Sequence, residues 1–311
     1  MKLLFVTPIP EEKKELFTCT DGVQITFKDR AQVTQEDLEG IDAVLGNLPA
    51  AMINENTSVR WLQLDSAGAD PYRSLRDDCI LTNASGAYGE AISEHLLACT
   101  LAVMKRLYPY REMQSRREWE NLGSVDTISM KNVLCVGLGD IGTEYARRMK
   151  LLGARVSGVR RTVHDKPEFL DELYSMEQLP DIIGDFDIVA LSLPGTPETV
   201  GLFNDAMLRR MKNGAILLNV GRGSAIVMDA LVRVMRDHHL SAACLDVTDP
   251  EPLPKNHALW NTENVYITPH ISGRFNAAVT YDKVLSIFHK NLMHFVKEEP
   301  LENIVDRKRG Y

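Results

Sequence analysis

The chain of 311 residues lacks the features of nucleic-acid-binding, membrane and secreted proteins. It has no basic excess, because 35 Lys and Arg face 43 Asp and Glu and the formal net charge is −8. Nucleic acids and anionic membrane surfaces attract basic proteins, so this balance argues against both as partners. The longest apolar stretch, residues 96–104, is far shorter than the ~20 residues that span a bilayer. The short apolar run at residues 3–6 is too brief for a signal-peptide core.

Cysteine is scarce and scattered. The sequence has five cysteines and no CxxC motif: Cys19, Cys79, Cys99, Cys135 and Cys244. An odd number without paired spacing is typical of free thiols in a reducing compartment, so we expect a cytoplasmic protein. Cys135 and Cys244 stand in apolar runs and are expected to pack in the core. No group of Cys, His and Asp has metal-ligand spacing, so no metal site is predicted.

Short β-branched runs alternate with amphipathic stretches, which predicts an α/β protein with parallel sheets. A length of 311 residues corresponds to about two domains. The predicted strands fall into two series: 2–7, 23–27, 43–46, 62–64 and 80–83, and then 133–137, 155–159, 188–193, 215–219, 242–246 and 265–268. Apolar periodicity further predicts a long helix from Glu90 to about Glu112 and another from Ala277 to Val296.

The segment 133–142 contains a GxGxxG motif between an apolar run and a helical pattern. Such a motif alone is weak evidence, but a second strand follows the helix at 155–159, which is the context of a dinucleotide site. Gly137 suits the tight turn, Gly139 permits close approach of a pyrophosphate, and Gly142 permits close helix packing. The helix N-terminus supplies free N–H groups for the phosphates.

The end of the second strand indicates which dinucleotide binds. NAD sites usually have an acidic residue there, but this sequence has Arg160 and Arg161. A guanidinium pairs well with a 2′-phosphate, and no carboxylate is present to repel one. We therefore expect NADP as the preferred cofactor, with NAD as the alternative.

Polar segments follow three later strands: 219–224, 246–254 and 268–273. With the glycine motif, and with weaker matches at 64–70 and 90–95, these segments resemble the D-isomer-specific 2-hydroxyacid dehydrogenase family, which includes glyoxylate and hydroxypyruvate reductases. The resemblance implies a Rossmann dinucleotide-binding domain over residues 98–274. It also implies a smaller, flavodoxin-like substrate domain made of residues 1–97 and 275–311, and a homodimer formed through the long helix.

The resemblance also implies site residues. By this match Arg222 binds the carboxylate and 2-oxo group of the substrate, His270 is the acid–base residue, and Glu251 is its partner. Further substrate contacts are expected at Asn47, Leu48, Ala67 and Gly68. The positions expected to bind the cofactor are Gly137, Gly139, Asp140, Ile141, Gly142, Arg160, Arg161, Leu193, Pro194, Thr199, Val220 and Asp246.

These residue types suit the reduction of a small 2-oxo acid to the D-2-hydroxy acid. Hydride transfer to C2 puts negative charge on the carbonyl oxygen, and a protonated histidine can neutralise it. A neighbouring carboxylate favours the protonated imidazole, and an arginine orients the substrate. Two alternatives stay open: an NAD-dependent enzyme resembling phosphoglycerate dehydrogenase, and a dinucleotide-sensing protein resembling the corepressors of this family.

Overall fold

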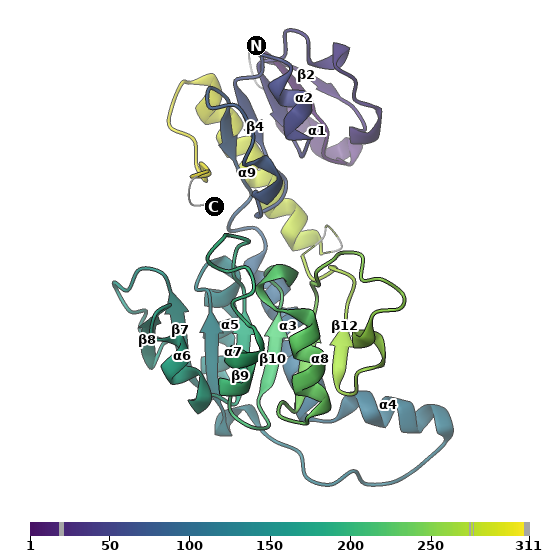
Figure 1. The fold of residues 1–311 in the computed structure, drawn as a ribbon. Helices are drawn as coiled ribbons and strands as arrows, with labels where there is room; N and C mark the ends of the chain where they lie inside the picture. The colour runs from purple at the N-terminus through teal and green to yellow at the C-terminus, as the bar shows by residue number, and fades with distance from the viewer. Residues whose placement is uncertain (19–21, 274, 276, 308–311) are drawn as a thin grey trace. The chain divides into compact units, whose positions relative to one another are not determined.

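The computed structural model describes residues 1–18, 22–273, 275 and 277–307. The chain divides into two compact units (Figure 1). Unit 1 comprises Met1–Tyr88 and Ala277–Tyr311, and unit 2 comprises Gly89–Asn276. The predicted free thiol of Cys19 lies outside the described residues. Among the described residues, no helix is long and apolar enough to cross a membrane.

Unit 1 is built on a parallel sheet in the order β2-β1-β3-β4-β5. The strands are β1 (Lys2–Phe5), β2 (Gln24–Phe27), β3 (Ala43–Leu45), β4 (Trp61–Gln63) and β5 (Ile80–Thr82). The helices are α1 (Glu11–Thr18), α2 (Ala50–Asn54) and α9 (Ala278–Val296). This strand order is that of flavodoxin-like sheets, in which ligands bind where the order reverses, here between β1 and β3.

Both faces of the unit 1 sheet are apolar. Leu4, Val44 and Leu62 stand in register on neighbouring strands and are at most 1% exposed. The next residue of β1, Phe5, points to the other face, because side chains alternate along a strand. There it contacts Phe17 of α1 and Phe288 of α9, with ring centroids 5.0 and 5.8 Å apart. On the opposite face, Ile53 of α2 packs in the same cluster as Leu4, Val44 and Leu62, so helices cover both faces, as in a doubly wound sheet.

Unit 2 has a larger parallel sheet in the order β12-β11-β10-β9-β6-β7-β8. The strands are β6 (Asn132–Val136), β7 (Arg155–Arg160), β8 (Glu172–Ser175), β9 (Ile188–Leu191), β10 (Ile216–Asn219), β11 (Ala242–Leu245) and β12 (Val265–Ile267). The helices are α3 (Gly89–Met104), α4 (Leu107–Arg116), α5 (Asp140–Leu151), α6 (Leu179–Ile182), α7 (Asp205–Arg210) and α8 (Met228–Arg236). The strand order reverses between β6 and β9, which identifies the ligand-binding edge of a Rossmann sheet.

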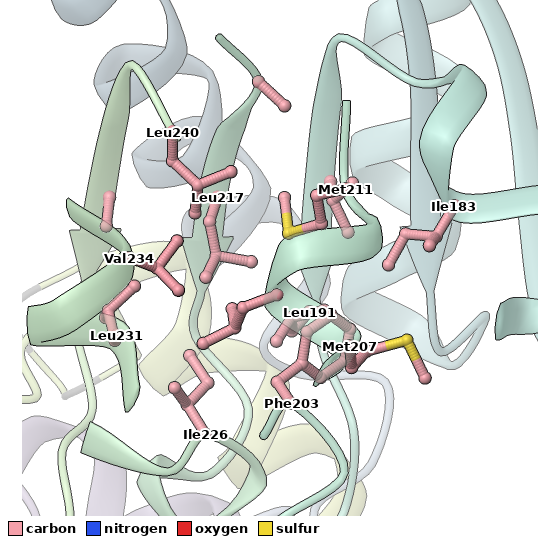
Figure 2. Close-up of a cluster of buried hydrophobic side chains, with 14 of the residues drawn as sticks. Ile183, Leu191, Phe203, Met207, Met211, Leu217, Ile226, Leu231, Val234 and Leu240 are labelled. Carbon is pink, nitrogen blue, oxygen red and sulfur yellow. The ribbon is translucent and has the colours of Figure 1, made fainter. Parts of the chain in front are cut away.

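The core of unit 2 lies between this sheet and the neighbouring helices α7 and α8 (Figure 2). Leu191 and Leu217 extend from β9 and β10 toward Met207 of α7 and Leu231 of α8. The helices α3 and α5 also pack against each other. A buried hydrogen-bonding contact of 2.8 Å joins the hydroxyl groups of Thr100 in α3 and Tyr145 in α5. The predicted core positions Cys135 and Cys244 are buried, which confirms that expectation.

The structure corrects the long helix predicted from Glu90 to Glu112. It forms two helices instead, because α3 ends at Met104 and Arg106 adopts a left-handed φ of 53° before α4 begins. The physical reason is Pro109, which has no N–H and whose ring would clash with the carbonyl of an uninterrupted helix. The structure also adds an edge strand, β8, whose partly exposed residues form no apolar run.

The boundary between the units also differs from the expected position. It falls between Tyr88 and Gly89, before α3, whereas the sequence placed it between residues 97 and 98. The second boundary lies at Asn276 and Ala277, close to the expected 274/275.

Candidate active site

The glycine motif forms a closed turn at the point where the unit 2 strand order reverses. Gly137 follows β6 with φ 98°, and a Cβ there would lie 2.8 Å from the backbone oxygen of Ser192 after β9. A Cβ on Gly142 would lie 1.9 Å from the carbonyl oxygen of Gly137. The hydroxyl of Ser192 donates to that same carbonyl at 2.9 Å. Side chains are therefore excluded from both glycines, and the start of α5 is held against the turn.

Gly139, in contrast, faces open space. Apart from its two chain neighbours, no described residue has an atom within 4 Å of a Cβ built on it, and it is the N-cap of α5. The first amides of a helix have no partner within the helix, so Asp140, Ile141 and Gly142 present N–H groups suited to an anion. The side chain of Asp140 is engaged elsewhere, since its Oδ2 accepts a 2.6 Å hydrogen bond from the backbone N–H of Gly89. This open cradle fits the pyrophosphate of a dinucleotide.

Arg160 ends β7, beside the glycine turn. Its Nη2 lies 3.4 Å from Nδ1 of His164 and donates to the carbonyl oxygen of Asp165 at 3.3 Å. Its Nε is buried and has no hydrogen-bond partner among the described residues. The neighbouring Arg161 is exposed. The strand end thus presents a guanidinium with an unsatisfied donor, and no acidic residue stands at this position.

Four other residues expected to contact the cofactor, Leu193, Pro194, Thr199 and Val220, lie on loops after β9 and β10, and Asp246 follows β11. Leu193 and Val220 are buried, with exposures of 6% and 7%. The hydroxyl of Thr199 donates to the carbonyl of Pro194 at 2.6 Å and accepts from the backbone N–H of Thr196 at 2.9 Å. These contacts fix the turn that follows β9 at the carboxyl edge of the sheet.

His270 and Glu251 come together at the same edge. Nδ1 of His270 lies 2.8 Å from Oε2 of Glu251, and the histidine side chain is 48% exposed. The other carboxylate oxygen, Oε1, accepts the backbone N–H of Thr248 at 3.0 Å. Because Nδ1 faces the carboxylate, Nε2 is the ring nitrogen left for other chemistry. His270 has a left-handed φ of 51°, which a non-glycine residue adopts only with support from its surroundings.

Asp246 supplies that support. It is 2% exposed, and its backbone oxygen accepts from the N–H of His270 at 2.8 Å. Its Oδ1 accepts from the hydroxyl of Thr268 at 2.5 Å and from the N–H of Ile271 at 3.0 Å. Its Oδ2 accepts from the N–H and hydroxyl of Ser272 at 3.1 and 2.5 Å. Both carboxylate oxygens therefore hold the segment that carries His270.

Arg222 follows β10 and is half-buried. Its Nη1 donates to the carbonyl of Gly221 at 2.9 Å, and the amide of Asn219 donates to the Arg222 carbonyl at 3.0 Å. A Cβ on Gly223 would lie 2.0 Å from the backbone of Thr248. The segments after β10 and β11 are therefore packed closely, and Arg222 is anchored beside the residue whose N–H holds Glu251.

In unit 1, the loop after β4 is held by amide side chains. Asn47 accepts from the N–H of Asp65 at 2.9 Å and donates to the hydroxyl of Ser66 at 3.2 Å. Asn83 donates to the carbonyl of Ala67 at 2.8 Å. Ala67 and Gly68 are half-buried, whereas the side chain of Leu48 is 1% exposed and packs in the core.

Asp65 begins this loop and is buried, with 5% exposure. Its Oδ2 accepts from the hydroxyl of Thr7 at 2.9 Å and from Nη2 of Arg30 at 2.6 Å. Burial raises the pKa of Asp65 and outweighs the opposing charge of Arg30 and the hydrogen bond from Thr7. Thr7 and Asn47 follow β1 and β3, so this cluster lies where the unit 1 strand order reverses.

Comparison with known proteins identifies the family. The model of the D-isomer specific 2-hydroxyacid dehydrogenase NAD-binding domain matches residues 97–272. The chain belongs to the D-isomer specific 2-hydroxyacid dehydrogenase family. It is therefore an NAD(P)-dependent oxidoreductase, and its two parallel α/β sheets are the Rossmann and flavodoxin-like domains expected from the sequence.

Relatives of this dehydrogenase match it over most of their length. A solved family protein from Aeromonas salmonicida is 30% identical, with a TM-score of 0.88 over 98% of this chain and 99% of that one. A family member from Xanthobacter autotrophicus, solved with NADPH and MES, is 26% identical, with a TM-score of 0.84 over 100% and 99%. Glyoxylate/hydroxypyruvate reductase A of Escherichia fergusonii is 28% identical over 273 residues, which are 88% of this chain and 79% of that protein.

Sequence reasoning missed several residues that position the dehydrogenase's candidate site. They are Thr7, Arg30, Asp65, Asn83, Thr248, Thr268 and Ser272. Thr7 and Asn83 carry a signal, because each is a polar residue within two positions of the carboxyl end of a strand. Arg30 carries no such signal, because it follows an edge strand and contacts Asp65 only in the folded protein.

Proposed function

We propose that the enzyme reduces a small 2-oxo acid to the D-2-hydroxy acid with NADPH. The observation that carries this proposal is the 2.8 Å contact between His270 Nδ1 and Glu251 Oε2, at the sheet edge that also presents Arg222 and the glycine turn. The similarity to a glyoxylate/hydroxypyruvate reductase supports the substrate class. The exposed imidazole supports access for a substrate.

In this proposal the reduced nicotinamide, when bound, supplies the hydride. His270 donates a proton from Nε2 to the carbonyl oxygen of the substrate, which gains negative charge as C2 is reduced. Glu251 stabilises the imidazolium form by charge and by its hydrogen bond at Nδ1. Arg222 binds the substrate carboxylate and orients the 2-oxo group. Asp246 fixes the backbone from which His270 extends.

Unit 1 contributes binding rather than proton transfer. We assign the backbone N–H groups of Ala67 and Gly68 to the carboxylate of the substrate. Asn47 holds the start of this loop and also takes part in binding the substrate side chain. The side chain of Leu48 is buried, so its contribution is limited to its backbone and to packing.

Arg160 is the basis for preferring NADPH. Its buried, unpartnered Nε and its half-exposed guanidinium are suited to a 2′-phosphate, which offers charged acceptors. The Xanthobacter relative, whose structure was solved with NADPH, supports the same preference. The exposed Arg161 is a second cation for the phosphate.

The test is kcat/KM for NADPH and NADH with glyoxylate, hydroxypyruvate and larger 2-oxo acids. We expect turnover with at least one of these acids and a preference for NADPH. Arg160→Asp removes a charged hydrogen bond worth about 1.5–3 kcal/mol, so the NADPH/NADH ratio falls roughly 10- to 100-fold. Arg155→Asp, at the exposed other end of the same strand, is the matched control and leaves the ratio unchanged.

An equal preference for the two cofactors would contradict the role of Arg160 and favour the NAD-dependent alternative. Binding of NADPH without turnover of any 2-oxo acid would contradict the enzymatic proposal and favour the dinucleotide-sensing alternative.

We also propose a homodimer that forms through α4 and the segment after it. The family resemblance motivates this proposal, and the exposed apolar side chains of Leu107, Trp119 and Met130, at 55%, 100% and 78%, are compatible with a surface that a second copy covers. Light scattering on the wild type and on Leu107→Lys tests this proposal. We expect twice the chain mass for the wild type and a shift toward the monomer for the variant.

A further inference from the structure

His95 is a half-buried histidine on α3 of unit 2, and no step of the proposed reduction uses it. Its Nε2 lies 3.4 Å from the hydroxyl oxygen of Thr268, which directly follows β12. The same ring nitrogen lies 3.6 Å from Sγ of Cys99, one turn further along α3. Because a half-buried imidazole can also bond to water, burial alone does not require either contact. The contact with Thr268 therefore needs its own explanation.

The hydroxyl of Thr268 determines which way this contact runs. The hydroxyl has a single proton, which it donates to Oδ1 of Asp246 at 2.5 Å, since an ionised carboxylate only accepts. The oxygen of Thr268 therefore has only acceptor capacity left for His95. This arrangement puts the imidazole proton on Nε2, so that the Nε2–H group donates to Thr268 and to the sulfur of Cys99.

Thr268 connects this N–H group to the segment that carries His270. The carboxylate of Asp246 also accepts the backbone N–H groups of Ile271 and Ser272, at 3.0 and 3.1 Å. The N–H of His270 is shared between the backbone oxygens of Asp246 and Thr268, at 2.8 and 3.0 Å. Rotation of the Thr268 hydroxyl would remove one donor from the carboxylate and loosen this segment. The Nε2–H group opposes that rotation, because it occupies the acceptor side of the hydroxyl oxygen.

The helix that carries His95 is itself anchored on α5. The backbone N–H of Gly89, the first residue of α3, donates to Oδ2 of Asp140 at 2.6 Å. Beyond His95, the hydroxyl groups of Thr100 and Tyr145 are 2.8 Å apart, and both side chains are fully buried. Because α5 holds α3 on either side of His95, the backbone from which the imidazole extends is fixed.

We propose that His95 is a positioning residue for the candidate acid. Its Nε2–H group keeps the hydroxyl of Thr268 directed at Asp246, and the Asp246 carboxylate then holds the backbone of His270. His95 acts through Thr268 and takes no part in proton transfer itself. This inference rests on the proposed function, because the residue that is positioned is the acid of that reaction.

The first test compares two substitutions of His95 in the full-length enzyme. Leucine has no N–H group, whereas the amide of glutamine places one the same number of bonds from Cβ as Nε2. We expect His95→Leu to lower kcat roughly 2- to 10-fold, as for one neutral hydrogen bond, and to leave KM within about a factor of two. We expect His95→Gln to recover most of this loss. Equal losses in the two variants would show that the N–H group is not what matters, and the proposal would be wrong.

His239→Leu is the matched control. His239 is also half-buried in unit 2, and its Nε2 lies 2.9 Å from the backbone oxygen of Met211. Because His239 precedes β11, it lies at the sheet edge opposite to the one that presents Thr268. We expect this variant to keep the wild-type kcat. A loss equal to that of His95→Leu would attribute both losses to general destabilisation and would overturn the proposal.

A double-mutant cycle separates this role from a merely structural one. Because His95 acts through the hydroxyl of Thr268, we expect His95→Leu to have no further effect on kcat once Thr268→Val has removed that hydroxyl. Additive losses would contradict this route. The pH dependence of log kcat/KM gives a second distinction, because His95 is neither the acid nor its charged partner. We expect the reductive limb to stay in place in His95→Leu, and a limb that moves to lower pH would overturn the proposal.

The last test does not depend on turnover. Hydrogen–deuterium exchange, followed by mass spectrometry, measures how firmly the backbone N–H groups of residues 270–272 are held. We expect this segment to exchange roughly 2- to 10-fold faster in His95→Leu than in the wild type, and His95→Gln to reverse the change. Unchanged exchange would show that His95 does not hold the segment. A wild-type enzyme that reduces no 2-oxo acid would contradict the proposed function instead, and the exchange rates would still test the contact.

Discussion

Each unit has a buried strand that is followed by an aspartate, and the two aspartates are used differently. Asp65 follows β4 in unit 1 and Asp246 follows β11 in unit 2, with exposures of 5% and 2%. The carboxylate of Asp246 accepts hydrogen bonds from the segment that carries His270, including two backbone N–H groups. The carboxylate of Asp65 accepts instead from two side chains, those of Thr7 and Arg30.

The difference separates two tasks. In unit 2 a side chain fixes the backbone from which the candidate acid extends, so under the proposed function we expect changes there to act on the rate of the chemical step. In unit 1 the loop of Ala67 and Gly68 is fixed by Asn47 and Asn83, and Asp65 anchors only its start. Under the proposed function we therefore expect changes in unit 1 to act on substrate affinity.

The largest effect is expected for His270→Asn. Asparagine tolerates the left-handed backbone of His270 but cannot donate a proton as an acid. General acid catalysis contributes ~10²–10⁴-fold, so kcat falls by that factor while the Kd for NADPH stays near the wild-type value. His238→Asn is the control, because His238 has a similar φ of 55° and no proposed role. A His270→Asn enzyme with wild-type kcat would show that the proton comes from elsewhere.

Asp246→Asn comes next. The amide keeps one acceptor oxygen, so it loses the charge and at least one of the paired contacts with Thr268, Ile271 and Ser272. Hydrogen bonds to a charged group contribute about 1.5–3 kcal/mol, which corresponds to a loss in kcat of roughly 10- to 100-fold. Thr268→Val removes one donor only, and we expect a smaller loss. Steady-state kinetics on both variants measure the two losses in kcat. Equal losses would contradict the expectation that Asp246→Asn is the more damaging change.

Arg30→Gln is expected to raise KM for the 2-oxo acid about 2- to 10-fold and to leave kcat within a factor of two. The physical reason is that the buried carboxylate of Asp65 loses its cation and the start of the loop loosens. Arg60→Gln is the control, because it breaks an exposed pair with Asp42 in the same unit. A fall in kcat with unchanged KM would contradict the expectation that unit 1 acts on substrate affinity and unit 2 on the rate of the chemical step.

The smallest effect is an opposite pH dependence of stability for Asp65 and Asp187. Burial raises the pKa of Asp187, but hydrogen bonds from Lys212 and from the N–H of Asn132 outweigh it, and the net pKa lies below 3.8. The contribution of Asp187 to the free energy of unfolding is present above the unfolded pKa of ~3.9 and is lost as pH falls through the lower folded pKa. Burial raises the pKa of Asp65 above the unfolded value of ~3.9. Its contribution to the free energy of unfolding is therefore present below pH ~3.9 and is lost as pH rises through the folded pKa.

Urea unfolding of Asp187→Asn and Asp65→Asn across pH 3–7 measures this difference. The destabilisation by Asp187→Asn shrinks as pH falls, and that by Asp65→Asn shrinks as pH rises. If the destabilisation by both variants changed in the same direction with pH, the opposite pKa shifts assigned to Asp65 and Asp187 would be wrong.

The sequence predicts the sheets well because most strands are buried on both faces and appear as apolar runs. Gly137, Gly139 and Gly142 are recognisable because the flanking strand and helix give the motif its context. β8 is missed because an edge strand needs no apolar run. The end of α3 is missed although Pro109 signals it, because the apolar periodicity continues across the break.

The contacts that position the site are harder to predict. The donors to Asp246 come from another strand end, and Arg30 meets Asp65 across 35 residues of chain. The contact between Cys99 and His95 follows from helical spacing, but the contact between His95 and Thr268 depends on how α3 packs on the sheet. Such contacts arise from tertiary packing and leave no local pattern.

The most direct test of the central claim, that His270 is the acid and Glu251 its partner, is the paired pH profile of wild type and Glu251→Gln. Reduction needs the protonated imidazole, so log kcat/KM with saturating NADPH falls as pH rises. The Glu251→Gln substitution removes the charge, while the amide oxygen of the new side chain can still accept the N–H of Thr248. We predict that the reductive limb moves to lower pH, with one pH unit for each ~1.4 kcal/mol lost between imidazolium and carboxylate. A limb that stays in place would show that Glu251 is not the partner of His270.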